Sequence, residues 1–245
     1  MSTALNAARA AVEAAQSARR APLKPRAKSV SADLVTDADA AAEAAAVAVI
    51  RADHPSDAIL GEEGANHTGT SPRRWLVDGI DGTVAFADRR DGWCSAVALE
   101  DEHGPLVAAI QDPFGDTYAA ARGEGATLNG EPIRLRAPRA LSAAHVATFF
   151  RQDRLVAPGV RASAHALLDA TGLLRHAGPG SLELAWVAAG RLDAWIQPET
   201  DPWDWLPGAL LVTEAGGEAR VVHKGTRWHI AGSSTVVDAI VELLT

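Results

Sequence analysis

Two aspartates three residues apart stand out as groups that could do chemistry. Residues 75–77 are apolar and predict a buried strand. This strand leads into Asp78 and Asp81, and a glycine follows each of them. Glycine lets backbone approach a ligand closely, and carboxylates at such a point could bind Mg²⁺, which prefers oxygen ligands and shares them with substrate phosphates. The alternative is an Asp-Gly-rich surface turn that binds nothing.

Three further segments join this one in a characteristic order, which makes four in all. Residues 33–39 read D-L-V-T-D-A-D, residues 61–63 read G-E-E, and residues 78–83 read D-G-I-D-G-T. Residues 203–204 and 214–217 read W-D and E-A-G-G. Together they resemble the D-L-V-T-x-x-D, G-E-E, D-P-I-D-G-T and W-D…E-A-G-G signatures of the inositol monophosphatase family, whose members are Mg²⁺-dependent phosphomonoesterases. The resemblance covers most of the chain.

The resemblance implies a site for two to three Mg²⁺ ions and inhibition by Li⁺. One ion is implied to bind Glu62, Asp78 and the carbonyl of Ile80. A second is implied to bind Asp78, Asp81 and Asp204, and a third, looser ion to bind Glu62 and waters. From the residues alone, Glu62 could instead form a solvated pair with its acidic neighbour, and Asp204 could simply cap a helix.

The same resemblance implies how water attacks the phosphate. The family uses a Thr–Asp pair to orient and deprotonate the water, and Thr83 and Asp39 occupy these positions. Glu62 joins them as a catalytic residue, and the N–H groups of Gly82 and Thr83 are implied to bind phosphate. Bound metal offsets the repulsion between the carboxylates, polarises the phosphoryl group and lowers the pKa of the attacking water. The alternative for Thr83 and Asp39 is helix capping.

Substrate-side positions depart from the family pattern. Residues 178–181 occupy the place of G-[ST]-A-A, so Pro179 lacks the usual hydroxyl. Gln197 stands where inositol phosphatases often have a glutamate that binds a ring hydroxyl. Gly79 stands in place of proline and is expected to loosen the turn. We predict that Pro179 and Gln197 contact the substrate and that the preference for inositol is altered.

The surrounding elements follow from periodicity and from glycine and proline breaks. Helices are predicted at 3–20, 37–51, 159–168, 181–189, 202–215 and 233–244. Strands are predicted at 58–60, 75–77, 93–99, 106–110, 116–121, 143–150, 173–176, 192–197, 218–222 and 229–231, with a hairpin signal at 129–130. This order predicts an α+β fold of layered sheets, and the resemblance implies a five-layered αβαβα sandwich. We expect one catalytic unit with an N-terminal α+β subdomain, 1–137, and a C-terminal α/β subdomain, 138–245.

Composition narrows the class of protein. The 245 residues are 47% hydrophobic, which is enough for a globular core, and the net charge of −8 disfavours nucleic-acid and anionic-membrane partners. Cys94 is the only cysteine, so there is no intrachain disulfide, as is typical of the cytoplasm. No apolar run reaches the roughly 18 residues of a membrane span. Residues 1–30 have a composition like a transit peptide, but their apolar spacing favours an amphipathic helix. The resemblance implies a homodimer.

The leading functional hypothesis is Mg²⁺-dependent hydrolysis of a small phosphate monoester. The first alternative is a phosphatase of the same fold that acts on histidinol phosphate, a sugar phosphate or a nucleotide phosphate. The second is a binding protein that keeps the fold without catalysis. The retained acids argue against the second alternative, because clustered carboxylates repel one another and destabilise a protein that has no cation to offset them.

Overall fold

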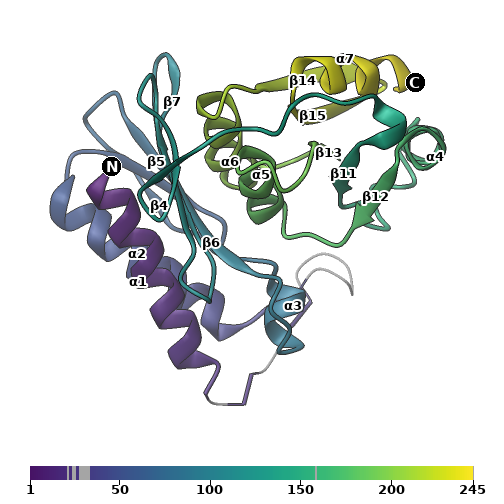
Figure 1. Ribbon diagram of the computed structural model, residues 1–245. Coiled ribbons are helices and arrows are strands. Elements are labelled where there is room, and N and C mark those ends of the chain that lie inside the picture. The colour runs from purple at the N-terminus through teal and green to yellow at the C-terminus, as the bar shows by residue number, and fades with distance from the viewer. Residues whose placement is uncertain (21, 24–25, 28–33, 158, 245) are drawn as a thin grey trace.

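The computed structural model describes residues 1–20, 22–23, 26–27, 34–157 and 159–244 (Figure 1). Its helices are α1 (Ser2–Ala18), α2 (Asp37–Asp53), α3 (Thr83–Ala87), α4 (Val160–Ala170), α5 (Gly180–Ala188), α6 (Pro202–Glu214) and α7 (Ser234–Leu243), with a 3₁₀ turn at Leu141–Ala143. Its strands are β1 (Arg26–Ala27), β2 (Leu34–Val35), β3 (Ala58–Gly61), β4 (Asn66–His67), β5 (Arg74–Asp81), β6 (Cys94–Asp101), β7 (Gly104–Gln111), β8 (Thr117–Ala121), β9 (Gly125–Leu128), β10 (Glu131–Ile133), β11 (His145–Thr148), β12 (Leu173–His176), β13 (Ala194–Pro198), β14 (Glu218–Lys224) and β15 (Thr226–Gly232).

The described elements form five layers. The larger sheet has the strand order β10-β9-β8-β7-β6-β5-β3-β4, and the smaller has the order β12-β11-β13-β15-β14. Helices α1 and α2 cover the outer face of the larger sheet, α5 and α6 lie between the two sheets, and α4 and α7 cover the smaller one (Figure 1). The predicted α+β sandwich is therefore confirmed. The chain passes from one sheet to the other between Ile133 and His145, and the subdomain boundary at 137/138 stays a prediction.

Strand β6 shows why strands of the larger sheet have apolar residues on both faces. Val97 and Leu99 belong to the core shared with α1 and α2, whereas Cys94 and Ala96 belong to the core shared with α5 and α6. Side chains alternate between the faces of a strand, so a strand covered on both sides needs apolar residues at every position. Cys94 is fully buried, as the sequence predicts. Among the described residues, no helix is long and apolar enough to cross a membrane.

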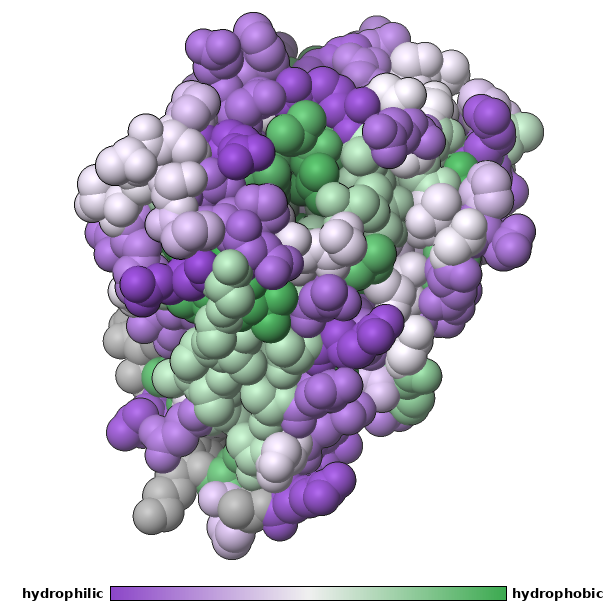
Figure 2. All heavy atoms as spheres, turned by 90° about the vertical axis from the view of Figure 1, so that its left-hand side faces the viewer, coloured by the Kyte–Doolittle hydropathy of each residue, from purple (hydrophilic) through white to green (hydrophobic). Residues whose placement is uncertain are grey.

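Helix α2 begins with a capping box that also orients a site residue. The side chain of Thr36 accepts a hydrogen bond from the N–H of Ala38, and Asp39 accepts one from the N–H of Thr36. Reciprocal bonds of this kind satisfy N–H groups that the first helical turn leaves free. The outer side of α2 is lined by exposed alanines, and Figure 2 shows hydrophobic residues gathered in the lower half of this face of the molecule. The capping box leaves Asp39 on the opposite, buried side of the helix.

The turn predicted after residue 77 is wrong, because β5 continues to Asp81. Its register against β6 shifts: Asp78 lies opposite Ala96, but Asp81 lies opposite Cys94. Three steps along β5 therefore match two along β6, which is a β-bulge with one extra residue. In a regular strand, residues three apart point to opposite faces. The bulge removes this alternation and lets both aspartates point toward the same place.

Candidate active site

The first two acidic groups come from neighbouring parallel strands. Strands β3 and β5 pair with Gly61 opposite Val77, so Glu62 and Asp78 follow at the same edge. The N–H of Glu62 donates to the carbonyl of Val77 over 3.1 Å, which continues the ladder by one residue. The carboxyl groups of Glu62 and Asp78 interact closely enough for the former to affect the pKa of the latter. Glu62 therefore lies at the same edge as Asp78, but it is not one of the three residues whose carboxylate oxygens lie within 4.8 Å of one another.

Three aspartates converge at this edge of the sheet. Carboxylate oxygens of Asp78, Asp81 and Asp204 all lie within 4.8 Å of one another. Asp204 arrives from the first turn of α6, in the layer between the sheets. Asp78 is only 2% exposed, and the other two are half-buried. Residues more than 120 positions apart in the sequence thus form one cluster, as the sequence predicts.

Burial and mutual repulsion make this cluster unfavourable when all three groups are charged. Burial, followed by the charges of Glu62, Asp81 and Asp204, raises the pKa of Asp78 well above its usual range. Burial and nearby acids also raise the pKa of Asp204. Burial raises the pKa of Asp81, although a 2.7 Å hydrogen bond from the N–H of Ser181 opposes this shift.

A hard divalent cation fits this set of donors. Oδ1 of Asp78 accepts a hydrogen bond from the N–H of Ile80 over 2.9 Å. Oδ2 of Asp78 is buried and has no hydrogen-bond partner among the described residues. A buried carboxylate oxygen without a partner is costly, and a cation shared with two further carboxylates would remove the cost. Oxygen-only donors are the ligands that Mg²⁺ prefers.

Thr83 and Asp39 form a direct pair beside the cluster. The hydroxyl of Thr83 donates to Oδ1 of Asp39 over 2.7 Å and lies 3.2 Å from the carbonyl oxygen of Ile80. Oδ2 of Asp39 accepts bonds of 2.6 and 2.7 Å from the side chain and N–H of Thr36. Asp39 is 1% exposed. The Asp39 carboxylate thus caps α2 through Oδ2 and binds Thr83 through Oδ1.

Gly82 makes the turn from β5 into α3. Its φ of 95° is left-handed, a conformation that costs glycine little. A Cβ at this position would lie 2.7 Å from the carbonyl oxygen of Gly92 and 3.2 Å from Cβ of Pro179. The next residue, Thr83, begins α3, where the first N–H groups of a helix have no partner within the helix. The backbone here can therefore offer N–H groups to an anion.

A sequence profile of the inositol monophosphatase family matches residues 1–242. The chain belongs to the inositol monophosphatase family. The Nus factor SuhB of Salmonella typhimurium strain 14028s is 34% identical over 221 residues, which are 86% of this chain and 82% of that protein. The inositol monophosphatase of Dictyostelium discoideum is 35% identical over 193 residues, which are 76% and 71% of the two chains.

Solved structures of this family share the fold. The extragenic suppressor protein SuhB from Bartonella henselae has a TM-score of 0.86 at 27% identity, covering 99% of this chain and 95% of that one. The inositol monophosphatase from Anabaena (Nostoc) sp. PCC 7120 has a TM-score of 0.84 at 29% identity, covering 99% and 93%. The layered sandwich is therefore the inositol monophosphatase fold.

The two residues that are predicted to contact the substrate lie near the start of α5. Pro179 precedes α5 and packs near Gly82, because a Cβ added at Gly82 would lie 3.2 Å from Cβ of Pro179. Gln197 lies on β13, and its Oε1 is 3.7 Å from the position of a Cβ on Gly180. The structure thus brings both residues to the segment that also supplies the N–H of Ser181 to Asp81.

Sequence reasoning missed one site contact and left one signature residue without a role. The N–H of Ser181 binds Asp81, and the only signal for it is that a predicted helix begins there. Glu214, from the second signature, accepts bonds of 2.9 Å from the N–H groups of Gly123 and Gly125. It fixes the hairpin between β8 and β9 and takes no part in the cluster. The second signature therefore combines a site residue with a structural one.

Removing one charge from the cluster is expected to stabilise the metal-free protein. The pKa of Asp78 is raised in the folded state, so folded protein binds more protons than unfolded protein between the ordinary value of 3.8 and the raised one. Stability therefore falls as pH rises through this range. At neutral pH and in chelator, we expect Asp78→Asn to melt a few degrees higher, at roughly 2–4 °C per kcal/mol for a chain of this size.

Thermal denaturation in chelator and in Mg²⁺ checks this expectation. Ligand binding to the folded state raises Tm, so Mg²⁺ should stabilise the wild type more than Asp78→Asn. A variant that melts below the wild type in chelator would show that the Asp78 carboxylate does not oppose folding.

Proposed function

We propose that this chain is a Mg²⁺-dependent phosphomonoesterase that hydrolyses a small phosphate ester with water as the nucleophile. The supporting observation is that the Asp78, Asp81 and Asp204 cluster lies beside the 2.7 Å Thr83–Asp39 pair. A cation site next to a proton acceptor is what attack by water on phosphorus requires. The lone cysteine is fully buried and is not available as a nucleophile.

The cation ligands are the three aspartates together with Glu62 and the carbonyl of Ile80. The family is Mg²⁺-dependent in general, and two to three ions per site is our proposal for this chain. When bound, Mg²⁺ supplies positive charge that polarises the phosphoryl oxygens and lowers the pKa of water. The N–H of Ser181 keeps Asp81 oriented toward its partners.

Thr83 and Asp39 orient the attacking water and take its proton. The hydroxyl hydrogen of Thr83 is directed at Oδ1 of Asp39, so the lone pairs of Oγ1 can accept a hydrogen bond from water. As the water oxygen bonds to phosphorus, its proton passes to Oγ1 of Thr83 and the hydroxyl proton passes to Asp39. The ester P–O bond breaks with its electron pair going to the leaving oxygen, which takes a proton from solvent water and departs as the alcohol, while Asp39 returns its proton to solvent. The N–H groups of Gly82 and Thr83 bind the phosphate.

Phosphate release from a panel of monoesters tests the proposal. We expect release in Mg²⁺, none in excess chelator, and inhibition by Li⁺, as the family resemblance implies. The panel contains inositol 1-phosphate, histidinol phosphate, several sugar phosphates and nucleotide monophosphates. Absence of Mg²⁺-dependent release from every ester would favour a binding protein of this fold over an enzyme. The homodimer and the cytoplasmic location stay predictions.

Inositol 1-phosphate is expected to be a poor substrate compared with another ester of the panel. The groups that bind metal and phosphate serve every substrate, so the choice among alcohols depends on residues such as Gln197 and Pro179. A neutral amide replaces a carboxylate at position 197, and a hydrogen bond to a charged group contributes up to about 3 kcal/mol. Pro179 offers no side-chain donor or acceptor. Sites that lose a hydrogen bond to a substrate hydroxyl lose much of their preference for it.

Comparing kcat/KM across the panel, with Gln197→Glu as the matched variant, decides this prediction. The glutamate should raise kcat/KM for inositol 1-phosphate by roughly tenfold or more and change that for the preferred ester less. If the unmodified enzyme has its highest kcat/KM for inositol 1-phosphate, then Pro179 and Gln197, which depart from the family pattern, leave the preference for inositol intact.

A further inference from the structure

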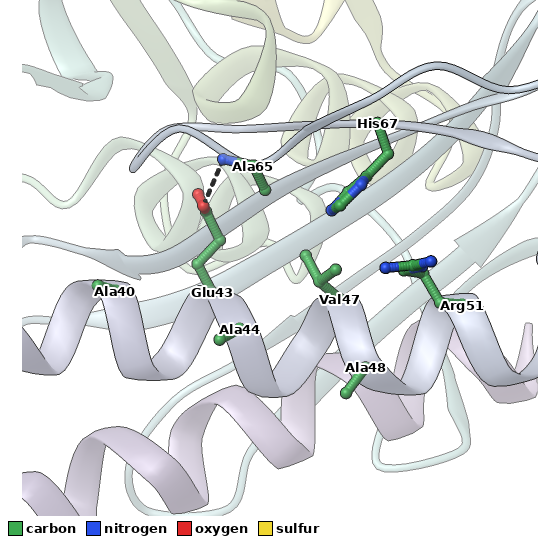
Figure 3. A pocket seen from close by; sticks show the side chains of 8 residues that line it. All are labelled: Ala40, Glu43, Ala44, Val47, Ala48, Arg51, Ala65 and His67. Carbon is green, nitrogen blue, oxygen red and sulfur yellow. Dashed lines mark hydrogen bonds between the residues drawn. The ribbon is translucent and has the colours of Figure 1, made fainter.

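Glu43 is a buried carboxylate that the proposed reaction does not use. It lies on α2, one turn after Asp39, and its side chain reaches away from the helix toward Ala65 (Figure 3). Its two oxygens accept hydrogen bonds from backbone N–H groups, Oε2 from Glu63 over 2.7 Å and Oε1 from Ala65 over 2.8 Å. Glu43 is only 5% exposed. Bonds from N–H groups to a carboxylate are among the stronger hydrogen bonds in proteins.

These N–H groups belong to the turn that carries Glu62. The N–H of Glu62 is itself bonded to the carbonyl of Val77 in β5. The N–H of Gly61 donates to the carbonyl of Ala65 over 2.7 Å and closes the turn. The turn is thus anchored on one side to the aspartate-bearing strand and on the other side to α2. Glu62 lies between the two anchors.

Gly61 leaves the space that the contact needs. A Cβ at this position would lie 2.2 Å from Oε2 of Glu43 and 2.4 Å from its carboxyl carbon. Real Cβ atoms do not approach other atoms so closely, so any side chain here would displace the Glu43 carboxylate. The glycine and the glutamate therefore fit together as one feature, although they lie 18 positions apart in the sequence.

We propose that Glu43 is a positioning residue for the metal site. By holding the backbone of the turn, it sets the direction in which Glu62 points toward Asp78. This inference rests on the proposed function, because it assigns the turn to a Mg²⁺ ligand. Helix α2 would then support the site twice, through Asp39 on the side of Thr83 and through Glu43 on the side of Glu62.

Calorimetric titration of the full chain with Mg²⁺ tests the proposal without relying on activity. Loss of a group that orients a ligand typically weakens metal binding about 10- to 100-fold. We expect Glu43→Gln to do so, because an amide presents an NH₂ group to one of the two backbone donors. In a Glu62→Gln background, the same change should alter Mg²⁺ affinity less than about twofold, because the effect is transmitted through Glu62.

The matched control is Glu214→Gln. Glu214 also accepts two backbone N–H bonds, from Gly123 and Gly125, in a hairpin outside the site. Its loss should lower Tm in the same way as the loss of Glu43, since the two carboxylates make the same kind of contact. The control should keep Mg²⁺ affinity within about twofold of the wild type. A difference between the two variants therefore separates positioning from general destabilisation.

Three results would overturn the proposal: a folded Glu43→Gln with wild-type Mg²⁺ affinity, an equal effect in both backgrounds, or an equal effect in Glu214→Gln. If Glu43→Gln does not fold, Gly61→Ala disturbs the same contact from the other side, and its Mg²⁺ affinity decides instead. A wild type that neither binds Mg²⁺ nor releases phosphate would refute the proposed function. A wild type that does both, beside an unaffected Glu43→Gln, refutes the positioning role alone.

Discussion

Asp81→Asn is expected to abolish Mg²⁺-dependent phosphate release while the fold survives. Asp81 is one of three aspartates whose oxygens lie within 4.8 Å of one another. Asparagine has nearly the same shape and keeps an oxygen that can accept the hydrogen bond from the N–H of Ser181. The variant therefore loses the negative charge and little else. Loss of one anionic ligand weakens both cation binding and its polarising effect, and we expect kcat/KM to fall more than about 100-fold.

Phosphate release and Mg²⁺ titration measure this effect, and thermal denaturation shows whether the fold survives. In chelator, Asp81→Asn should melt no lower than the wild type, because the repulsion that raises the pKa of Asp78 and Asp204 decreases. The control is Asp88→Asn, which removes an exposed charge paired with Arg90 just beyond the motif. The control should keep wild-type turnover. Full turnover by Asp81→Asn would exclude this aspartate from the metal site.

The sequence predicts most of the longer helices and strands of this protein, because burial on both faces of the larger sheet and alternation of helices and strands leave clear patterns. It does not predict the short helix α3 after the aspartate motif or the short strand β4. It does not predict how Asp78 and Asp81 come to face the same way. Their spacing of three puts them on opposite faces of a regular strand, and only the register against β6 reveals the extra residue. A single sequence contains no direct signal for the register between two strands.

Packing between distant segments is the other part that the sequence leaves open. The expectation that Gly79 loosens a turn does not apply, because β5 is a strand at this position. A Cβ at Gly79 would lie 2.6 Å from the backbone nitrogen of Glu43, so the glycine allows α2 to pack closely on β5. This contact joins residues 36 positions apart. The positioning role proposed for Glu43 depends on the same close packing and is equally invisible in the sequence.

For Asp39, both roles considered from the sequence, pairing with Thr83 and capping of a helix, are seen in the structure. Family resemblance identifies Thr83 and Asp39 as partners, and the structure places them 2.7 Å apart. The alternative of helix capping is also correct for Asp39, which closes the capping box of α2 with its other oxygen. Capping alone does not explain why the hydroxyl of Thr83 is directed across to a different helix.

Thr83→Ala is expected to lower kcat by about 10²–10⁴ and to leave KM within a few-fold of the wild type. A positioned general base contributes a factor of this size to the rate. In the proposed mechanism the hydroxyl of Thr83, which donates to Asp39, connects the attacking water to that carboxylate. Because the backbone N–H groups of Gly82 and Thr83 remain in the variant, phosphate binding should change little. An interaction that is made mainly in the transition state lowers kcat without raising KM.

Steady-state kinetics at saturating Mg²⁺ on the preferred ester measure this separation. Thr83→Ser keeps a hydroxyl at the same position and should retain most of the turnover, which makes it the matched control for the loss of the methyl group. Asp39→Asn should resemble Thr83→Ala in kcat, because a neutral amide cannot take the proton. It should also melt lower, because it removes a negative charge from the N-terminus of α2. Near wild-type turnover by Thr83→Ala would mean that water is activated without this pair, through the cation and Glu62. A fall in kcat that Thr83→Ser does not restore would instead point to packing of α3 as the cause.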